Sequence, residues 1–256
     1  MMKKTLFVLI AILAVGCIKS QKKSIPQTEK KDWWLWAANW HPNDDEIVVG
    51  GTQDTLRLFS TTESRLLKNY PVEGTITKVK WHPTENILAF SVQGGKSKTS
   101  ILNIDTGKRI ELDSINEFGV RAIGWNTNGE FLAVGDYDGI IGIYDKGGNF
   151  VKRIPTEQKA IIGLDWHPSQ DLIVAVGEKI TLYDLSSDSL RHIKHRKNDV
   201  LMLCVEWHPT GELFVTGDYG DFQYNYPPYL QFWSANGEKL KTVEKSKAEY
   251  RNLKWS

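Results

Sequence analysis

The chain has 256 residues, of which 41% are hydrophobic and 25% are charged, which suits one large all-β domain or two small domains. Its 32 lysines and arginines balance 31 aspartates and glutamates, so the chain lacks the strongly basic domain of a nucleic-acid-binding protein. The two cysteines, Cys17 and Cys204, are too few for a disulfide framework or a cysteine-based metal site. Cys204 lies in an apolar run, and we expect it to be a small buried residue.

The N-terminus carries a short apolar stretch, residues 6–15, behind a positively charged start. The stretch is shorter than the roughly 20 residues that span a bilayer, and it has the length and flanks of a secretory signal. It ends in Ala14-Val15-Gly16-Cys17, which resembles the lipobox of bacterial lipoproteins, although leucine is usual where Ala14 stands. The resemblance implies a signal peptide over 1–16 and lipidation of Cys17. An ordinary cleaved signal with an incidental cysteine is the alternative.

Residues 17–32 are polar and rich in lysine, and cannot bury enough apolar surface to fold. As a flexible coil they would hold the following domain on the order of 20 Å from a membrane. We therefore expect a lipid-anchored tether and a location in the bacterial cell envelope, in the periplasm or at the cell surface.

From residue 33 onward one pattern recurs, a tryptophan that is in most cases followed by His-Pro. The repeat tryptophans lie 41, 44, 41 and 41 residues apart, and a further one, Trp255, comes 48 residues after the last. They are Trp40, Trp81, Trp125, Trp166 and Trp207. A period of 40–45 residues is the signature of propeller blades, each a four-stranded sheet.

Each repeat unit contains four short β-branched or aromatic runs separated by Gly, Pro, Asn and Asp, which predicts four strands joined by turns. The complete units are 33–73, 76–115, 119–155, 160–196 and 200–244. No helical periodicity follows Cys17. The fold class expected for 33–256 is therefore all-β, a β-propeller with five complete units.

At the expected end of each third strand, a large apolar residue precedes a small polar one. These pairs are Phe59-Ser60, Ile104-Asp105, Tyr144-Asp145, Tyr183-Asp184 and Trp233-Ser234. They resemble the Trp-Asp pair of the WD-repeat family, whose Gly-His pair is absent here. The resemblance implies a propeller that presents loops and a central channel to protein partners.

Residues 249–256 restart the first strand of a sixth unit, where the sequence stops. An open ring would leave apolar faces and a strand edge uncovered. Three outcomes stay open: the ring closes with five blades, a partner or second copy completes it, or the chain is truncated relative to a six- or seven-bladed ancestor. We favour truncation.

The repeated histidines His41, His82, His167 and His208 occupy one position in four units, so they would lie far apart and predict a structural role instead of a metal site. His192 and His195 are expected to point to opposite faces of one strand. No catalytic residue, metal site or cofactor is predicted.

The fifth unit carries a long insert, residues 218–229, between its second and third strands. Its aromatic residues favour a binding surface, and the triplet Gly-Asp-Tyr at its start also occurs in the third unit. Because such loops leave one face of a propeller, both could contribute to one patch. The candidate residues are Asp136, Tyr137, Asp138, Asp218, Tyr219, Asp221, Phe222, Tyr224, Tyr226 and Tyr229. The alternative is an elaborated loop that packs on its own blade.

The function expected from these features is a non-catalytic protein-interaction scaffold in the bacterial cell envelope, bound to other proteins and to a membrane through its lipid. Two alternatives remain, a propeller enzyme of the hydrolase or lyase type and a module that binds carbohydrate or another small ligand.

Overall fold

The computed structural model describes residues 34–94, 98–113, 119–197 and 200–255. All of them belong to one compact unit, residues 33–256. The expected signal peptide, Cys17 and the tether lie outside the described residues. No helix among the described residues is long and apolar enough to span a membrane.

Five four-stranded antiparallel sheets make up the described part of the chain, each following chain order from its first strand to its fourth. The first contains β1 (Leu35–Trp40), β2 (Glu46–Gly51), β3 (Thr55–Ser60) and β4 (Arg65–Pro71). The second contains β5 (Thr75–Trp81), β6 (Ile87–Gln93), β7 (Thr99–Asn103) and β8 (Arg109–Glu111). The third contains β9 (Val120–Trp125), β10 (Phe131–Asp136), β11 (Ile140–Asp145) and β12 (Phe150–Pro155). The fourth contains β13 (Gly163–Trp166), β14 (Leu172–Val176), β15 (Ile180–Asp184) and β16 (Ser189–Ile193). The fifth contains β17 (Met202–Trp207), β18 (Leu213–Asp218), β19 (Leu230–Ser234) and β20 (Lys239–Val243).

These sheets confirm the predicted all-β fold of four-stranded WD-type blades, and each is called a blade below. The large-apolar and small-polar pairs stand at the ends of the third strands in four blades, and in the second blade Ile104 directly follows β7. The insert of the fifth blade adds one short 3-10 helix, η1 (Phe222–Tyr224), the only helical turn among the described residues.

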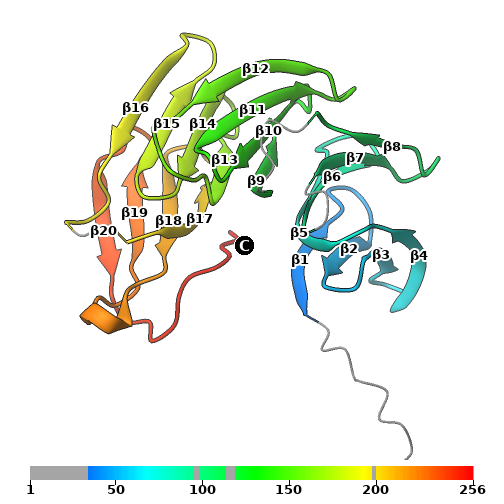
Figure 1. The fold of residues 1–256 in the computed structure, drawn as a ribbon, viewed down its shortest axis with the longest axis horizontal. Helices are drawn as coiled ribbons and strands as arrows, with labels where there is room; N and C mark the ends of the chain where they lie inside the picture. The colour runs from blue at the N-terminus through cyan, green and yellow to red at the C-terminus, as the bar shows by residue number, and fades with distance from the viewer. Residues whose placement is uncertain (1–33, 95–97, 114–118, 198–199, 256) are drawn as a thin grey trace, which may run out of the picture. The chain divides into compact units, whose positions relative to one another are not determined.

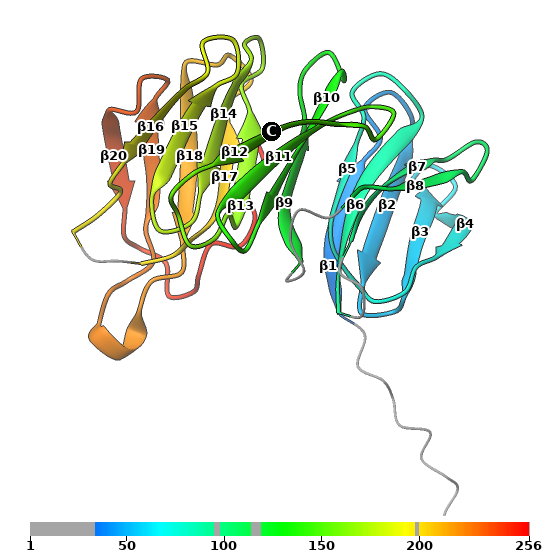
Figure 2. The ribbon, with the colours of Figure 1, turned by 45° about the horizontal axis from the view of Figure 1, so that its top comes forward.

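The first strand of each blade lies innermost, and consecutive first strands contact one another from β1 through β5, β9 and β13 to β17. Figures 1 and 2 show the five sheets standing face to face in chain order around this inner row. The fourth strands lie at the outside, and most of their side chains are exposed or partly buried, with Tyr70 and Ile154 buried.

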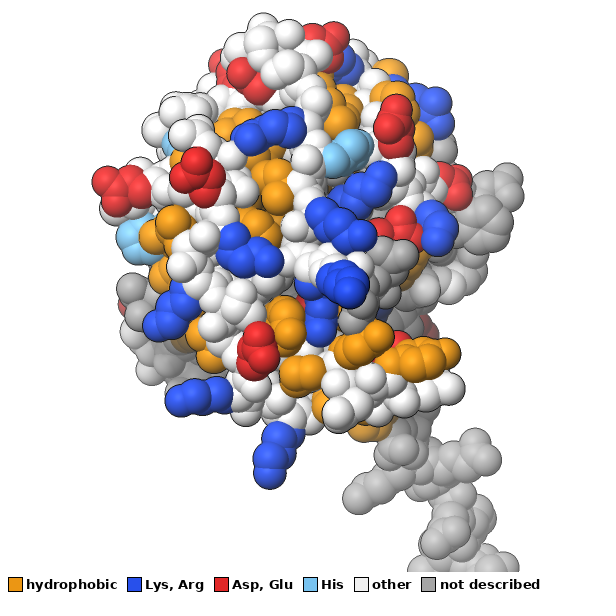
Figure 3. Space-filling view, turned by 90° about the vertical axis from the view of Figure 1, so that its left-hand side faces the viewer, with side chains coloured by type: hydrophobic (Ala, Val, Ile, Leu, Met, Phe, Trp, Pro, Cys, Tyr) orange, Lys and Arg blue, Asp and Glu red, His pale blue; other side chains and the backbone are white. Residues whose placement is uncertain are grey.

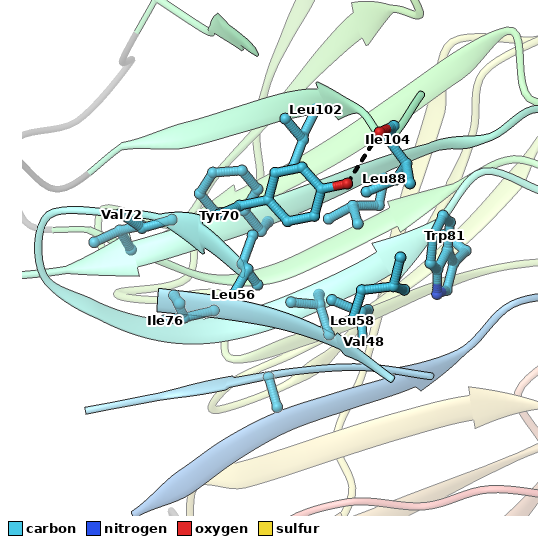
Figure 4. Packing of buried hydrophobic residues seen from close by; sticks show 14 residues of the cluster. Val48, Leu56, Leu58, Tyr70, Val72, Ile76, Trp81, Leu88, Leu102 and Ile104 are labelled. Atoms are coloured by element: carbon cyan, nitrogen blue, oxygen red, sulfur yellow. Dashed lines mark hydrogen bonds between the residues drawn. The ribbon is translucent and has the colours of Figure 1, made fainter. Parts of the chain in front are cut away.

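Apolar side chains from adjacent blades share one core. In the first cluster, Leu56 and Tyr70 of the first blade pack with Ile76 and Leu88 of the second (Figure 4). The Tyr70 hydroxyl donates to the Ile104 carbonyl oxygen at 2.9 Å, which adds a polar link between the blades. Similar clusters join the later blades, so consecutive sheets bury apolar side chains between them.

A one-residue bulge recurs where the first strand pairs with the second. In four blades the register leaves one residue of the first strand without an opposite partner. These extra residues are Trp36, Thr77, Arg121 and Leu203. A bulge of this kind redirects a side chain and often lies beside a functional site.

The C-terminal segment, residues 249–255, pairs into no sheet but occupies the place of a first strand beside the fifth blade. A Cβ added at Gly217 would lie 2.4 Å from the Tyr250 Cβ, just as one added at Gly135 would lie 2.4 Å from Ile161 of the next blade. The Tyr250 amide also donates to the Asp218 carbonyl oxygen at 3.2 Å. The expected first strand of a sixth unit is therefore present as a docked segment without a partner strand of its own.

Candidate functional site

The repeat tryptophans join each blade to the one before it. Three indole N–H groups donate to a backbone carbonyl oxygen of the preceding blade, just before its own tryptophan. The pairs are Trp81 with Asn39 at 3.1 Å, Trp125 with Lys80 at 3.2 Å and Trp166 with Gly124 at 2.8 Å. In the fifth blade the Trp207 amide donates to the Asp165 carboxylate at 2.8 Å instead. These indoles are structural.

The repeated histidines pack edge-on against the tryptophan of the following unit, with ring centroids 4.5 to 5.0 Å apart. The pairs are His41 with Trp81, His82 with Trp125, His167 with Trp207 and His208 with Trp255. Burial lowers the pKa of His82, which keeps its ring neutral at pH 7. The described residues hold no group of three His, Cys, Asp or Glu side chains that is placed to bind a metal ion.

The sequence suggested that His192 and His195 lie on one strand, but His195 lies outside it. Strand β16 ends at Ile193, and His195 is buried beyond it with its Nε2 3.8 Å from the Asp218 carboxylate. The neighbouring Arg196, also beyond the strand, donates to the same carboxylate at 2.9 Å.

In the third blade, the triplet at 135–137 closes its own turn. Asp136 is fully buried, and its carboxylate accepts the backbone N–H groups of Asp138 and Ile140 at 2.9 and 2.8 Å. Partial burial raises the pKa of the Tyr137 hydroxyl, against the opposing effect of Arg121. Of the three candidate residues in this loop, only Asp138 is exposed.

In the fifth blade, Asp218 closes the insert at both ends. Its Oδ1 accepts the N–H groups of Gly220 at 3.0 Å and Tyr229 at 2.8 Å. Its Oδ2 accepts from Arg196 Nη1 at 2.9 Å, and both side chains are buried. Because an unpaired buried charge is costly, this ion pair fixes the two ends of the insert together.

Arg196 organises the second half of the insert. The same Nη1 donates to the Pro227 carbonyl oxygen at 3.2 Å, and the guanidinium lies 3.7 Å from the centroid of the Tyr229 ring. The Tyr226 ring lies 5.7 Å from it on the insert. Two candidate tyrosines are thus used to hold the loop through cation–π contacts.

The tip of the insert is a closed turn. Asp221 caps η1 by accepting the Gln223 and Tyr224 N–H groups, and Asn225 ends it in the left-handed conformation, with φ of 57°. Asp221 and Tyr226 exchange two backbone hydrogen bonds of 2.7 Å. A short polar residue tolerates this left-handed geometry better than a bulky one.

Three aromatic side chains on the insert remain exposed: Tyr219 at 47%, Phe222 at 61% and Tyr224 at 64%. Figure 3 shows the side of the molecule that bears β20, where hydrophobic side chains lie between lysines and arginines. The insert therefore divides into residues that build it and residues that it presents. The aspartate carboxylate of each Gly-Asp-Tyr triplet accepts backbone N–H groups of its own loop.

Sequence reasoning missed Arg196 because it lies in a different loop, 22 residues before its carboxylate partner. It also missed an uncovered aromatic surface on the first blade, where Trp34, Leu35, Trp36 and Trp40 are exposed. The repeat pattern could have predicted this surface, because Trp40 belongs to the first repeat unit and the other repeat tryptophans pack against the preceding one.

Comparison with known proteins agrees with this architecture. Residues 112–169 match the model of the anaphase-promoting complex subunit 4 WD40 domain. The human F-box-like/WD repeat-containing protein TBL1X is 30% identical over 117 residues, which is 40% of this chain and 20% of that protein. The zebrafish (Danio rerio) intraflagellar transport protein 122 homolog is 24% identical over 184 residues, which covers 68% of this chain and 15% of that protein. The Dictyostelium discoideum WD repeat-containing protein AAC3 is 25% identical over 152 residues, 57% of this chain and 31% of that protein.

The chain thus spans less than a third of the length of these relatives. The residues matched by the family model include β9 to β13, in the third and fourth blades. In its five four-stranded sheets and its regularly spaced tryptophans, the chain is similar to WD-repeat proteins.

Proposed function

We propose that this protein is a non-catalytic interaction scaffold, anchored in the bacterial cell envelope through a lipid on Cys17, which captures a protein partner with the insert of its fifth blade. WD-type propellers present their loops to partners, and the similarity to WD-repeat proteins supports the same role here. The observation that carries the proposal is the set of exposed rings, Tyr219, Phe222 and Tyr224, on a loop held by a buried ion pair.

The insert suits protein recognition because its backbone is ordered before a partner arrives. The Asp218–Arg196 pair and the cap at Asp221 fix the loop, so binding need not order it. Exposed tyrosine and phenylalanine then supply large contact areas with few side-chain torsions to restrict. An ordered loop with exposed aromatic rings favours binding of a folded protein partner.

The test is a crosslinking pull-down from membranes with the triple variant Tyr219→Ala/Phe222→Ala/Tyr224→Ala. These side chains pack little on their own blade, so the variant should fold normally and lose the crosslinked partner. The control Leu240→Ala removes an equally exposed apolar side chain, 57% exposed, from β20 of the same blade. Capture by the control but not by the triple variant supports the proposal, and equal capture by both contradicts it. Capture of a polysaccharide instead of a protein would favour the carbohydrate-binding alternative.

The lipid anchor is tested separately with Cys17→Ser in a bacterial host. We expect the wild-type chain to partition with membranes and to carry the mass of acyl chains, because two chains bind a bilayer stably at about 0.8 kcal/mol per buried methylene. The serine variant should lose both properties. If the variant is processed and released like the wild type, Cys17 is incidental to an ordinary cleaved signal.

A further inference from the structure

A cavity of about 430 Å³ lies where the inner strands approach the C-terminal segment. In Figure 1 the C-terminus lies beside the row of first strands, and the Lys78 ammonium donates to Asn252 Oδ1 at 3.1 Å. The lining residues are Trp34, Leu35, Trp36, Thr77, Lys78, Arg121, Ile162, Leu203, Arg251 and Asn252. The volume falls in the range of sites that bind small molecules.

One position of the repeat builds most of this wall. The residue four places before each tryptophan lines the cavity in all five blades and in the C-terminal segment. These residues are Trp36, Thr77, Arg121, Ile162, Leu203 and Arg251. Four of them are the extra residues of the bulges, so the same local distortion turns each toward the cavity. The tryptophan position is constant across the repeats, whereas this position differs in size and charge.

The charged side chains of the wall are all cationic: Lys78, Arg121 and Arg251 line the cavity, and no carboxylate does. Arg251 is paired with Glu249 beside the cavity. Within the described residues, Lys78 and Arg121 form no ion pair. Lys78 has only the neutral Asn252 amide, and the Arg121 guanidinium lies 5.5 Å from the Trp36 ring centroid. Lys78 and Arg121 therefore bring positive charge to the cavity without an ion-pair partner on its wall.

The surroundings of Lys78 make this charge costly. Burial, and next the neighbouring Lys80, lower the pKa of Lys78 to about 8, and Arg121 acts in the same direction. The other titratable groups around the cavity are Cys204, whose pKa burial raises to about 12, Glu206, which is paired with Lys254, and the buried Asp165. An anion in the cavity would relieve the repulsion between Lys78, Lys80 and Arg121.

The remaining wall is apolar. The Trp34 and Leu35 side chains are 64% and 68% exposed, which is unusual for such large apolar groups. Trp36, Ile162 and Leu203 continue the same surface. Flat indoles next to uncompensated cations match a ligand that carries both an apolar ring and an acidic group.

We propose that this cavity binds a small organic anion, whose acidic group contacts Lys78 and Arg121 and whose flat apolar body lies against Trp34 and Trp36. The cavity shares no residue with the insert of the fifth blade, so either site can fail without the other.

The test uses three probes with one naphthalene body, titrated into the full chain by calorimetry: 2-naphthoate, neutral 2-naphthylmethanol and cationic 2-naphthylmethylammonium. We expect 2-naphthoate to bind at least about tenfold more tightly than the neutral probe at pH 7, since a hydrogen bond to a charged group contributes about 1.5 kcal/mol or more. Inorganic phosphate, which lacks the apolar body, should bind more weakly than 2-naphthoate.

Lys78→Met and Arg121→Gln should each weaken 2-naphthoate binding by about tenfold and leave the neutral probe unchanged. The control Arg153→Gln removes an exposed cation from β12 of the blade that carries Arg121, and it should bind like the wild type. Thermal unfolding of each variant shows whether it is folded.

The pH provides an independent readout. Because Lys78 loses its proton as the pH rises through about 8, binding of 2-naphthoate should weaken between pH 7 and pH 9, with proton uptake on binding near pH 8. In Lys78→Met both effects should disappear. Equal affinity for the three probes, phosphate binding as tight as that of 2-naphthoate, or unchanged affinity in folded Lys78→Met would each overturn the proposal.

Discussion

The repeat tryptophan of the first blade and those of the other four occupy one sequence position but differ in burial. Trp40 is 62% exposed, whereas Trp81, Trp125, Trp166 and Trp207 are 4 to 9% exposed. The difference arises because each buried tryptophan lies against the preceding blade, and no described residue plays that part for Trp40. Burial here depends on the neighbouring blade and not on the local sequence.

The opposite end of the array is covered. Residues 249–255 pack on the fifth blade, where Tyr250 lies over Gly217 and Trp255 over His208. The array therefore has one end covered by its own chain and one end with exposed indoles.

The largest effect is expected for a tryptophan inside the array. Trp166→Ala should lower the free energy of unfolding by about 3 to 5 kcal/mol, because it removes a buried ring and leaves the Gly124 carbonyl oxygen without its donor. Trp40→Ala should lower it by less than about 1 kcal/mol, as for most exposed positions. Urea unfolding of both variants measures the difference. Equal losses would mean that the exposed end is covered in solution.

Lys78 lies where the two ends approach each other, and Lys78→Met should stabilise the protein by up to about 3 kcal/mol at pH 7. Its folded pKa of about 8 lies below the ordinary lysine value of 10.5, so the unfolded chain binds more protons between those values. The charge penalty is full below pH 8 and disappears as the pH rises to about 10.5. The gain in Tm should shrink over that window, whereas exposed Lys108→Met should give no gain at any pH. A constant gain across the window would show that the charge is not its source.

Substitutions at Gly135 and Gly217 compare how firmly the next blade and the C-terminal segment are held against their neighbouring sheets. Gly135→Ala should cost about 2 kcal/mol, because its Cβ collides with Ile161 of the next blade and the two sheets must separate. Gly217→Ala should cost less than about 1 kcal/mol, since its Cβ meets Tyr250 of the C-terminal segment, which can move away, and Cys204 Sγ, the end of a short side chain. Limited proteolysis checks this, and cleavage within 245–255 should increase only in Gly217→Ala. Equal destabilisation would indicate a segment bound as firmly as a full blade.

Much of the fold could be predicted from the sequence, because one tryptophan period, four short runs per unit and turn residues between them agree on a single architecture. The candidate insert was also recognisable from its length and its tyrosines. Which residues hold the insert in place and which are exposed could not be predicted, because Asp218 and Arg196 meet only after two loops fold together. Both aspartates of the Gly-Asp-Tyr triplets turn out to hold backbone N–H groups.

The cavity was missed for a different reason. Its cations look unremarkable one at a time, and Arg121 and Arg251 are separated by many apolar and polar residues. Aligning the units on their tryptophans, and then reading the fourth residue before each, would have gathered six lining residues into one column. The bulge that turns this position inward could not be inferred, because bulges depend on register and not on composition.

The bulge separates two roles within a unit, the contacts between blades and the side chain that faces the cavity. The tryptophan and histidine that bind neighbouring blades lie at one end of the first strand, and the side chain that faces the cavity lies four residues away. A mutation at the inward position can therefore alter what the cavity recognises while the joints between blades stay intact. Each repeated unit thus contributes one side chain to the cavity wall, and each of these side chains can vary independently to change which ligand is bound.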